Sequence, residues 1–96
     1  MKITEGVVTL VGKQPGKTLT IMGGVHGDEI CGIKALDEII PNISLERGKI
    51  HFVYGNPRAI KICKRQIEMN LNRAFRSDEL LSEKEKQSYE RQRALE

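Results

Sequence analysis

Aromatic residues are scarce in this chain of 96 residues, and tryptophan is absent. Only 4% of the residues are aromatic, whereas 39% are hydrophobic, so any core must be mainly aliphatic. One small domain of this length buries about 60–65% of the surface of its unfolded chain. Charged residues make up 30% of the chain, which is typical of a globular protein rather than a disordered one.

Long hydrophobic runs are missing as well. The apolar stretches are far shorter than the roughly 20 residues that a membrane-spanning helix needs. No basic start followed by an apolar segment opens the chain, so we expect no signal peptide. These absences predict a soluble cytoplasmic protein without a membrane partner.

Cysteine is rare, and Cys31 and Cys63 form no CxxC or CxxH pair, so we expect reduced thiols. The net charge is +3 and the pI is near 9.0. Nucleic-acid binding is not expected, because no aromatic residues that could stack on bases alternate with the basic ones. The basic residues then form either a solvated face or a site for an anionic small molecule; they include Lys61, Lys64, Arg65, Arg73 and Arg76.

The pattern along the chain predicts an α/β fold. Residues 2–11 and 17–23 favour strands, the second largely buried, and a turn over residues 12–17 joins them. Residues 28–40 have apolar side chains at helical spacing, and Pro41 ends the helix. Residues 48–54 predict a third strand, so a βαβ unit with parallel pairing and a right-handed crossover is expected.

The most informative segment is Gly-Gly-Val-His-Gly-Asp-Glu at residues 23–29, where the predicted second strand meets the helix. His26 and Glu29 can converge on one Zn²⁺, because catalytic zinc sites are commonly built from two His and one Glu. Ligand sites in open α/β sheets also lie beyond the carboxyl ends of strands. Alternatively, His26 only caps the helix and the acidic residues favour its N-terminal dipole.

A second informative stretch follows the third strand. It contains Asn-Pro-Arg-Ala at residues 56–59, then Arg65, then Asn-Leu-Asn-Arg-Ala-Phe at residues 70–75. Arginines and asparagines together can form a pocket for carboxylates, since the guanidinium group binds them bidentately. A surface segment with hydrated arginines is the alternative.

Together, the two stretches resemble the aspartoacylase and succinylglutamate desuccinylase family, a branch of the zinc carboxypeptidase-like hydrolases. The resemblance runs from about residue 19 to residue 96 and rests on two ordered blocks. These are residues 23–32, which match Gly-Gly-x-His-Gly-Asn/Asp-Glu-x-x-Gly, and residues 56–59, 65 and 72–75, followed by residues 89–94 as the start of a family helix.

The resemblance implies a partial three-layer α/β/α unit and a zinc-dependent amidohydrolase. Its substrates would be N-acyl amino acids such as N-acetylaspartate or N-succinylglutamate. His26 and Glu29 would be zinc ligands, Arg65 would polarise the scissile carbonyl, and Asn72 and Arg73 would hold the free carboxylate of the substrate.

Two departures from the family pattern affect this expectation. Asn70 stands where family members often carry Asp, which removes a charge that could orient an arginine. The family's third zinc ligand and its general base lie further downstream than Glu96, and His51, within the predicted third strand, matches no ligand position. We therefore expect residues 1–96 to be the N-terminal part of a single catalytic domain, inactive alone.

The last twenty residues are rich in charge and predict a loop and a solvated helix. A non-catalytic binding or assembly module is the alternative function, with the Arg/Asn cluster serving an anionic ligand or another subunit. A homo-oligomer formed through unpaired sheet edges is a further hypothesis.

Overall fold

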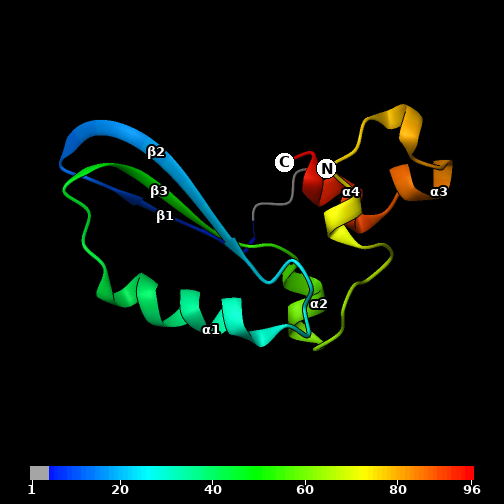
Figure 1. The fold of residues 1–96 in the computed structure, drawn as a ribbon, viewed down its shortest axis with the longest axis horizontal. Coiled ribbons are helices and arrows are strands. Elements are labelled where there is room, and N and C mark those ends of the chain that lie inside the picture. Colours follow the sequence, from blue (N-terminus) through cyan, green and yellow to red (C-terminus); the bar gives the residue numbers. More distant parts are fainter. Residues whose placement is uncertain (1–4) are drawn as a thin grey trace.

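A computed structural model describes residues 5–96 and shows a mixed α/β fold (Figure 1). Three strands form one sheet in the order β1-β3-β2, with β1 at Val7–Val11, β2 at Gln14–Gly23 and β3 at Arg47–Tyr54. β3 pairs parallel to β2 and antiparallel to β1. The predicted α/β class and the partly parallel sheet are confirmed, and the hand of the crossover stays a prediction.

The predicted turn over residues 12–17 is wrong in its length. Only Gly12 and Lys13 separate β1 from β2, and the first residues of β2 already pair with the start of β3. The register is irregular between Gln14 and Thr18, where Pro15 lies. An edge strand tolerates this proline because one side of its backbone needs no partner. The predicted first strand begins only at Val7, and residues 1–4 lie outside the described part.

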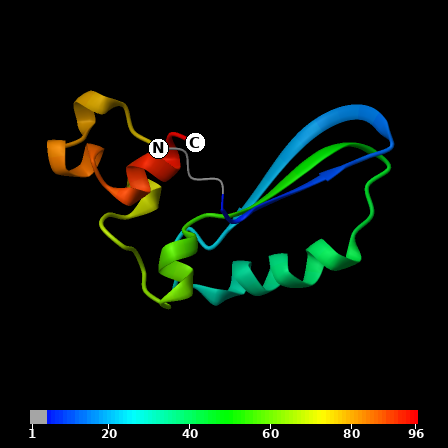
Figure 2. The ribbon, with the colours of Figure 1, turned by 180° about the vertical axis from the view of Figure 1, so that it is seen from behind.

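Helix α1, at Ile30–Ile39, connects β2 to β3 and covers one face of the sheet (Figures 1 and 2). It continues into a 3₁₀ turn at Ile40–Asn42, which contains the predicted terminator Pro41. Leu36 packs with Ile50 and Phe52 of β3 in a cluster of buried residues. Tyr54 donates a hydrogen bond to Asp37 and so ties the end of β3 to α1.

The expectation that β2 is largely buried is wrong. Every residue of β2 except Gly23 is exposed, including Leu19 at 53% and Met22 at 43%. β2 is an edge strand and has a neighbouring strand on one side only. Leu36, the buried residue of α1, packs on β3. Apolar composition predicted a strand correctly, but burial depends on covering layers that the described residues do not supply.

The C-terminal half forms a second group of short elements. These are α2 at Pro57–Lys61, 3₁₀ turns at Leu71–Arg73 and Asp78–Leu80, α3 at Glu83–Lys86 and α4 at Tyr89–Ala94. α3 begins with a capping box in which Ser82 and Glu85 bind each other's backbone N–H, and Ser88 caps α4. A second buried cluster holds them together, made of Met69, Leu71, Ala74 and Leu81.

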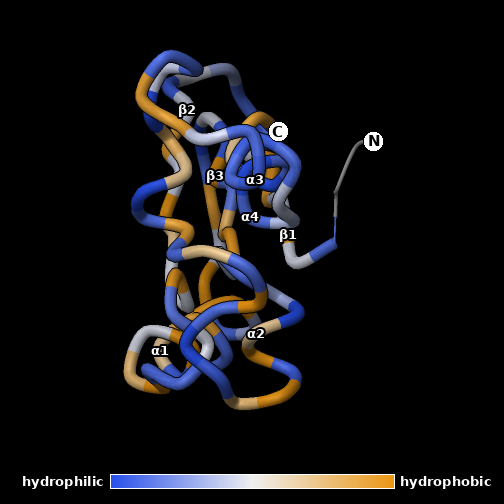
Figure 3. The backbone as a smooth tube through the Cα atoms, turned by 90° about the vertical axis from the view of Figure 1, so that its right-hand side faces the viewer, coloured by the Kyte–Doolittle hydropathy of each residue, from blue (hydrophilic) through white to orange (hydrophobic). Residues whose placement is uncertain are grey.

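The prediction of a solvated C-terminal helix is wrong for α4. Tyr89, Glu90, Arg91 and Arg93 are all buried. Backbone groups of the preceding loops bind the charged groups of Glu90, Arg91 and Arg93. Figure 3 shows hydrophobic residues, in orange, along the strands and also around α1 and α2. Among residues 5–96, none of the helices has the length and apolar character to cross a membrane.

Candidate metal and substrate site

Two glycines determine the path of the turn between β2 and α1. Gly24 has a φ of +70°, in the left-handed region that favours glycine. A Cβ on Gly27 would lie 2.4 Å from the carbonyl oxygens of Ala59 and Lys64. The N–H of Gly27 donates to the carbonyl of Arg65 at 3.3 Å. Because Gly27 has no side chain, the turn can lie directly against the segment that follows α2.

The ring of His26 lies between two oxygen atoms from different parts of the chain. Its Nδ1 is 2.9 Å from Oε1 of Glu29, and its Nε2 is 3.0 Å from Oδ1 of Asn70. The same Oδ1 accepts the backbone N–H of Asn72 at 2.9 Å, so the oxygen of the Asn70 amide faces the ring. Nε2 must therefore carry a proton and donate it to Asn70.

This arrangement decides what the other ring nitrogen can do. In a neutral ring with a proton on Nε2, Nδ1 presents a lone pair to the carboxylate of Glu29. Two acceptors 2.9 Å apart repel each other unless a cation lies near both or the ring takes a second proton. Imidazole nitrogen and carboxylate oxygen are both ligands of Zn²⁺, so the pair fits that ion.

The described residues supply only part of a zinc site. Across residues 5–96, no group of three or more His, Cys, Asp or Glu side chains is placed to hold a metal ion. The His26 side chain is 14% exposed and that of Glu29 is 66% exposed, so the carboxylate is open to solvent. A hollow of about 540 Å³ runs along the turn, lined by residues 22–25 and 28–32.

The segment at residues 70–73 lies against the turn through Asn70. This residue caps the 3₁₀ turn Leu71–Arg73, whose Leu71 is anchored in the second buried cluster. Asn72 and Arg73 follow Leu71 in this turn, and both are exposed. The structure thus brings the two sequence blocks together, but Asn70 contacts His26 rather than the arginine that its position suggested.

Arg65 lies beside the same turn. Its backbone carbonyl accepts the N–H of Gly27, and its side chain is exposed. The structure therefore places Arg65 and Asn70 against the turn that carries His26 and Glu29, and Asn72 and Arg73 lie two and three residues beyond Asn70. Their catalytic, substrate-binding and metal-binding roles stay predictions.

Sequence reasoning missed Glu90, a fully buried carboxylate in α4. It accepts hydrogen bonds from the Asn56 side chain at 2.7 Å and from the backbone N–H groups of Ile67, Glu68 and Met69 at 2.8, 2.9 and 3.0 Å. Burial raises the pKa of its carboxyl, but these donors outweigh burial and hold the pKa below its ordinary value. The only sequence signal was a glutamate at the start of a predicted helix.

Two buried arginines of α4 bind other loops. Arg91 donates to the carbonyls of Ala74 and Arg76 at 2.6 and 2.7 Å and pairs with Asp78 at 2.7 Å. Arg93 donates to the carbonyls of Gly55 and Tyr54, both at 3.0 Å. These guanidinium groups thereby tie α4 to the end of β3 and to the segment after the Leu71–Arg73 turn.

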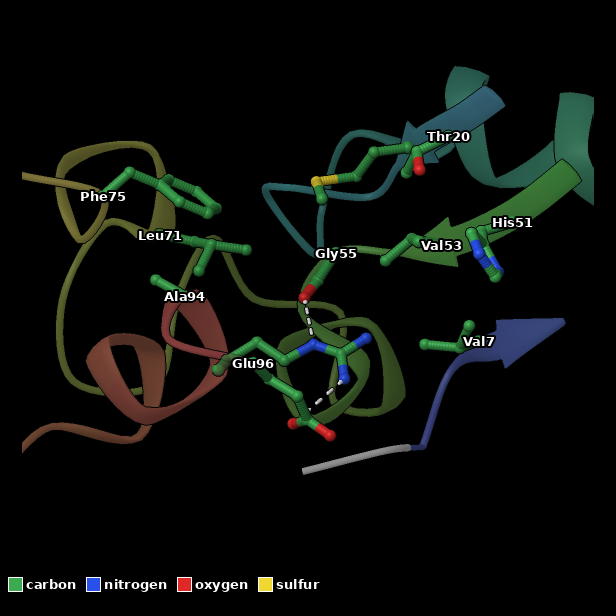
Figure 4. Close-up of a pocket in the computed structure, with 11 residues that line it drawn as sticks. Val7, Thr20, His51, Val53, Gly55, Leu71, Phe75, Ala94 and Glu96 are labelled. Atoms are coloured by element: carbon green, nitrogen blue, oxygen red, sulfur yellow. Dashed lines mark hydrogen bonds and ion pairs between the residues drawn. The ribbon is translucent and has the colours of Figure 1, made fainter. Parts of the chain in front are cut away.

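A separate apolar pocket of about 290 Å³ lies on the sheet face opposite α1 (Figure 4). Val7, His51 and Val53 line it from the strands, and Leu71, Phe75 and Ala94 from the other side of Gly55. His51 is in β3, and its Nδ1 lies 2.8 Å from the hydroxyl oxygen of Thr9. This histidine has a partner within the sheet, which agrees with the expectation that it is a strand residue.

Cys31 and Cys63 are both free and exposed.

The structure thus has a βαβ unit with His-x-x-Glu after its first strand and an Asn-Leu-Asn-Arg segment that contacts this motif through Asn70. The model of the succinylglutamate desuccinylase/aspartoacylase catalytic domain matches residues 15–96, and the chain belongs to this family. The resemblance inferred from the two blocks is confirmed.

Individual relatives carry the two family names. The chain is 42% identical over 88 residues to aspartoacylase of Danio rerio, covering 86% of this chain and 28% of the relative. It is 34% identical over 94 residues to aspartoacylase of Mus musculus, covering 94% of this chain and 30% of the relative. It is 38% identical over 64 residues to succinylglutamate desuccinylase of Pseudomonas syringae pv. tomato, covering 62% of this chain and 19% of the relative. The chain thus spans less than a third of these relatives, and no solved structure matches it.

Proposed function

We propose that residues 1–96 are the N-terminal part of a zinc-dependent hydrolase domain that cleaves the amide bond of N-acyl amino acids. Family membership supports a deacylase, and the names of the relatives suggest N-acetylaspartate or N-succinylglutamate as substrates. The observation that carries the proposal is the His26 ring, whose Nε2 is held by Asn70 while Nδ1 faces Glu29. The complete domain would have the three-layer α/β/α architecture.

His26 and Glu29 would hold the zinc ion. When bound there, Zn²⁺ supplies a Lewis acid that makes bound water a nucleophile near neutral pH. Asn70 keeps the proton on Nε2, so Nδ1 retains the lone pair that a metal needs. The hydrogen bond also fixes the plane of the ring, which reduces the entropy lost when a ligand binds.

Arg65, Asn72 and Arg73 would recognise the anionic substrate. All three are exposed; the backbone of Arg65 contacts the His26 turn, and the backbone N–H groups of Asn72 and Arg73 donate to Asn70. A guanidinium group offers paired donors to a carboxylate, and an amide adds directional hydrogen bonds. Arg65 would stabilise negative charge on the scissile carbonyl oxygen, and Asn72 and Arg73 would bind the free carboxylate.

The described residues offer two zinc ligands, so we expect the third ligand and the general base to come from elsewhere in the domain. Residues 1–96 alone would bind zinc weakly and would not turn over substrate. Reduced affinity is expected because each missing ligand leaves a position that water must fill. A cytoplasmic location and the absence of nucleic-acid and membrane partners remain parts of the prediction.

Zinc titration of the chain by isothermal calorimetry tests the proposal. We expect His26→Ala to abolish binding, because it removes one of the two described ligands. His51→Ala is the matched control, since it removes the other histidine of the chain, which lies in β3. Equal zinc affinity in His26→Ala and in the unmodified chain would contradict the proposal.

A non-catalytic module for an anionic ligand is a second candidate. The observation in its favour is that, within residues 5–96, only two candidate metal ligands converge, while Arg65 and Arg73 are exposed. Acetylaspartate or succinylglutamate would then bind in the presence of EDTA, and Arg73→Ala would weaken that binding. If binding of either compound requires zinc, the module hypothesis fails.

A further inference from the structure

Glu90 is placed where both motif blocks meet. Asn56, which donates to its Oε2, is itself fully buried and lies two residues after the end of β3. The backbone N–H of Asn56 donates to the carbonyl of Gly24 at 2.9 Å, two residues before His26. The Asn56 side-chain oxygen accepts the N–H of Ala59 and so caps α2. Glu90 therefore reaches the His26 turn through one intermediate residue.

The second connection of Glu90 leads to Asn70. Three successive backbone N–H groups, of residues 67, 68 and 69, point at the Glu90 carboxylate. Successive backbone N–H groups that converge in this way suit a negatively charged group. Asn70 follows directly, and its side-chain oxygen holds Nε2 of His26. The carboxylate thus fixes the segment that presents Asn70, just as it fixes the segment before His26.

An ionised carboxylate suits this position and an amide does not. All four partners of Glu90 are uncharged N–H donors, and a carboxylate can accept all of them. A glutamine would accept with one oxygen only, and its NH₂ group would face two of the donors. Loss of these bonds would release residues 67–69 without removing any residue from the candidate site.

We propose that Glu90 is a positioning residue of the zinc and substrate site, which sets the His26 ring against Asn70 by holding residues 67–69 and Asn56. The expected effect of Glu90 on zinc affinity rests on the proposed function. The expected effect on the hydrogen bond between His26 and Asn70 does not. A merely structural Glu90 would stabilise the chain without affecting that contact.

Two measurements on the chain separate these roles. The first is the ¹⁵N spectrum of the histidine rings without metal, in which His51 serves as an internal reference on the other sheet face. The second is zinc affinity measured by competition with a chelator. Glu90→Gln is the test variant, and Ile50→Val is the control, because it weakens the sheet cluster without touching α4.

In Glu90→Gln, we expect the His26 ring signals to move toward an average of the two tautomers while those of His51 stay in place. Amide exchange at residues 67–69 should be at least about tenfold faster, the loss expected for a hydrogen bond to a charged group. Zinc affinity should fall roughly tenfold, which is the low end of the losses seen when a residue that orients a metal ligand is replaced. Ile50→Val should change neither the ring signals nor the affinity.

The proposal is overturned if amide exchange at residues 67–69 quickens while the His26 signals stay unchanged, or if Ile50→Val shifts these signals equally. Should the unmodified chain bind no zinc, the proposed function fails, and the ring signals still decide the positioning role. If Glu90→Gln does not fold, Glu90→Asp replaces it. Aspartate keeps the charge but is shorter, so a smaller shift of the same His26 signals is expected, and no shift overturns the proposal.

Discussion

Asn70 connects the two motifs of this chain through one hydrogen bond. Its oxygen binds Nε2 of His26, a residue 44 positions earlier in the sequence. A neutral amide can hold the tautomer of the ring, but it adds no negative charge behind it. A carboxylate at the same position would make the imidazole a stronger ligand, since groups behind a metal ligand tune its basicity.

Asn70→Asp should therefore strengthen zinc binding by roughly tenfold. The measurement is competition with a chelator at constant pH and ionic strength. Asn72→Asp is the matched control, because it adds the same charge two residues away, and only the backbone N–H of Asn72 contacts Asn70. An equal gain in both variants would show a general effect of charge and contradict this explanation.

Helix α4 is a short element that organises the loops around it through charge. It has only six residues, yet Glu90, Arg91 and Arg93 each bind a different segment. Helices this short are not stable alone, so these contacts and the Ser88 cap hold it in place. Its stability should then depend on the ionisation of Glu90, the buried acid among the three.

The pH dependence of unfolding tests this dependence. Because the Glu90 pKa lies below the 4.5 of an unperturbed group, ionised Glu90 stabilises the fold at neutral pH, and this stabilisation is lost as the pH falls through its folded pKa. In urea titrations between pH 7 and 3, the free energy of unfolding of the unmodified chain should decrease below about pH 4.5.

Glu90→Gln should be less stable than the unmodified chain at pH 7, by about 1–3 kcal/mol for donors left unpaired. It should also lose part of the acid-induced decrease. Glu85→Gln is the control: the backbone and side-chain hydrogen bonds of Ser82 lower the pKa of Glu85, but Glu85 is only partly buried, whereas Glu90 is fully buried. An identical pH profile for Glu90→Gln and the unmodified chain would disprove the role of ionised Glu90.

Residues 5–96 form two hydrophobic clusters, and polar contacts join them. One lies between α1 and β3, and the other lies among the short C-terminal elements. Phe52 is fully buried in the first cluster and is one of only two phenylalanines in the chain. The aliphatic side chains around it cannot fill the space that a lost aromatic ring would leave.

Phe52→Ala should lower the free energy of unfolding by about 3–5 kcal/mol. This is a large part of the roughly 5–15 kcal/mol that stabilises a typical domain, so partial unfolding at 25 °C is expected. Urea unfolding followed by circular dichroism measures the effect, with the exposed Leu95→Ala as the control. A loss below 1 kcal/mol would mean that the sheet cluster contributes little.

Local patterns predicted those elements that short-range rules define. The helix before Pro41 and the strand ending at Tyr54 lie close to where periodicity and turn residues placed them. The burial of β2 and of α4 was mispredicted, since it depends on which layers lie above a strand or helix. His26, Glu29, Arg65, Asn72 and Arg73 could be selected from the two motifs, whereas Glu90 could not, because a single buried carboxylate has no sequence pattern.

The sequence by itself determined the α/β class and the family, and it selected the candidate site residues, whose roles stay predictions. These properties depend on spacing along the chain, such as three residues from His26 to Glu29. Only the tertiary structure decided that Asn70 fixes the His26 ring and that Glu90 holds both segments around it. Such contacts join groups more than twenty residues apart, and their strength comes from burial and hydrogen-bond geometry, which exist only once the chain is folded.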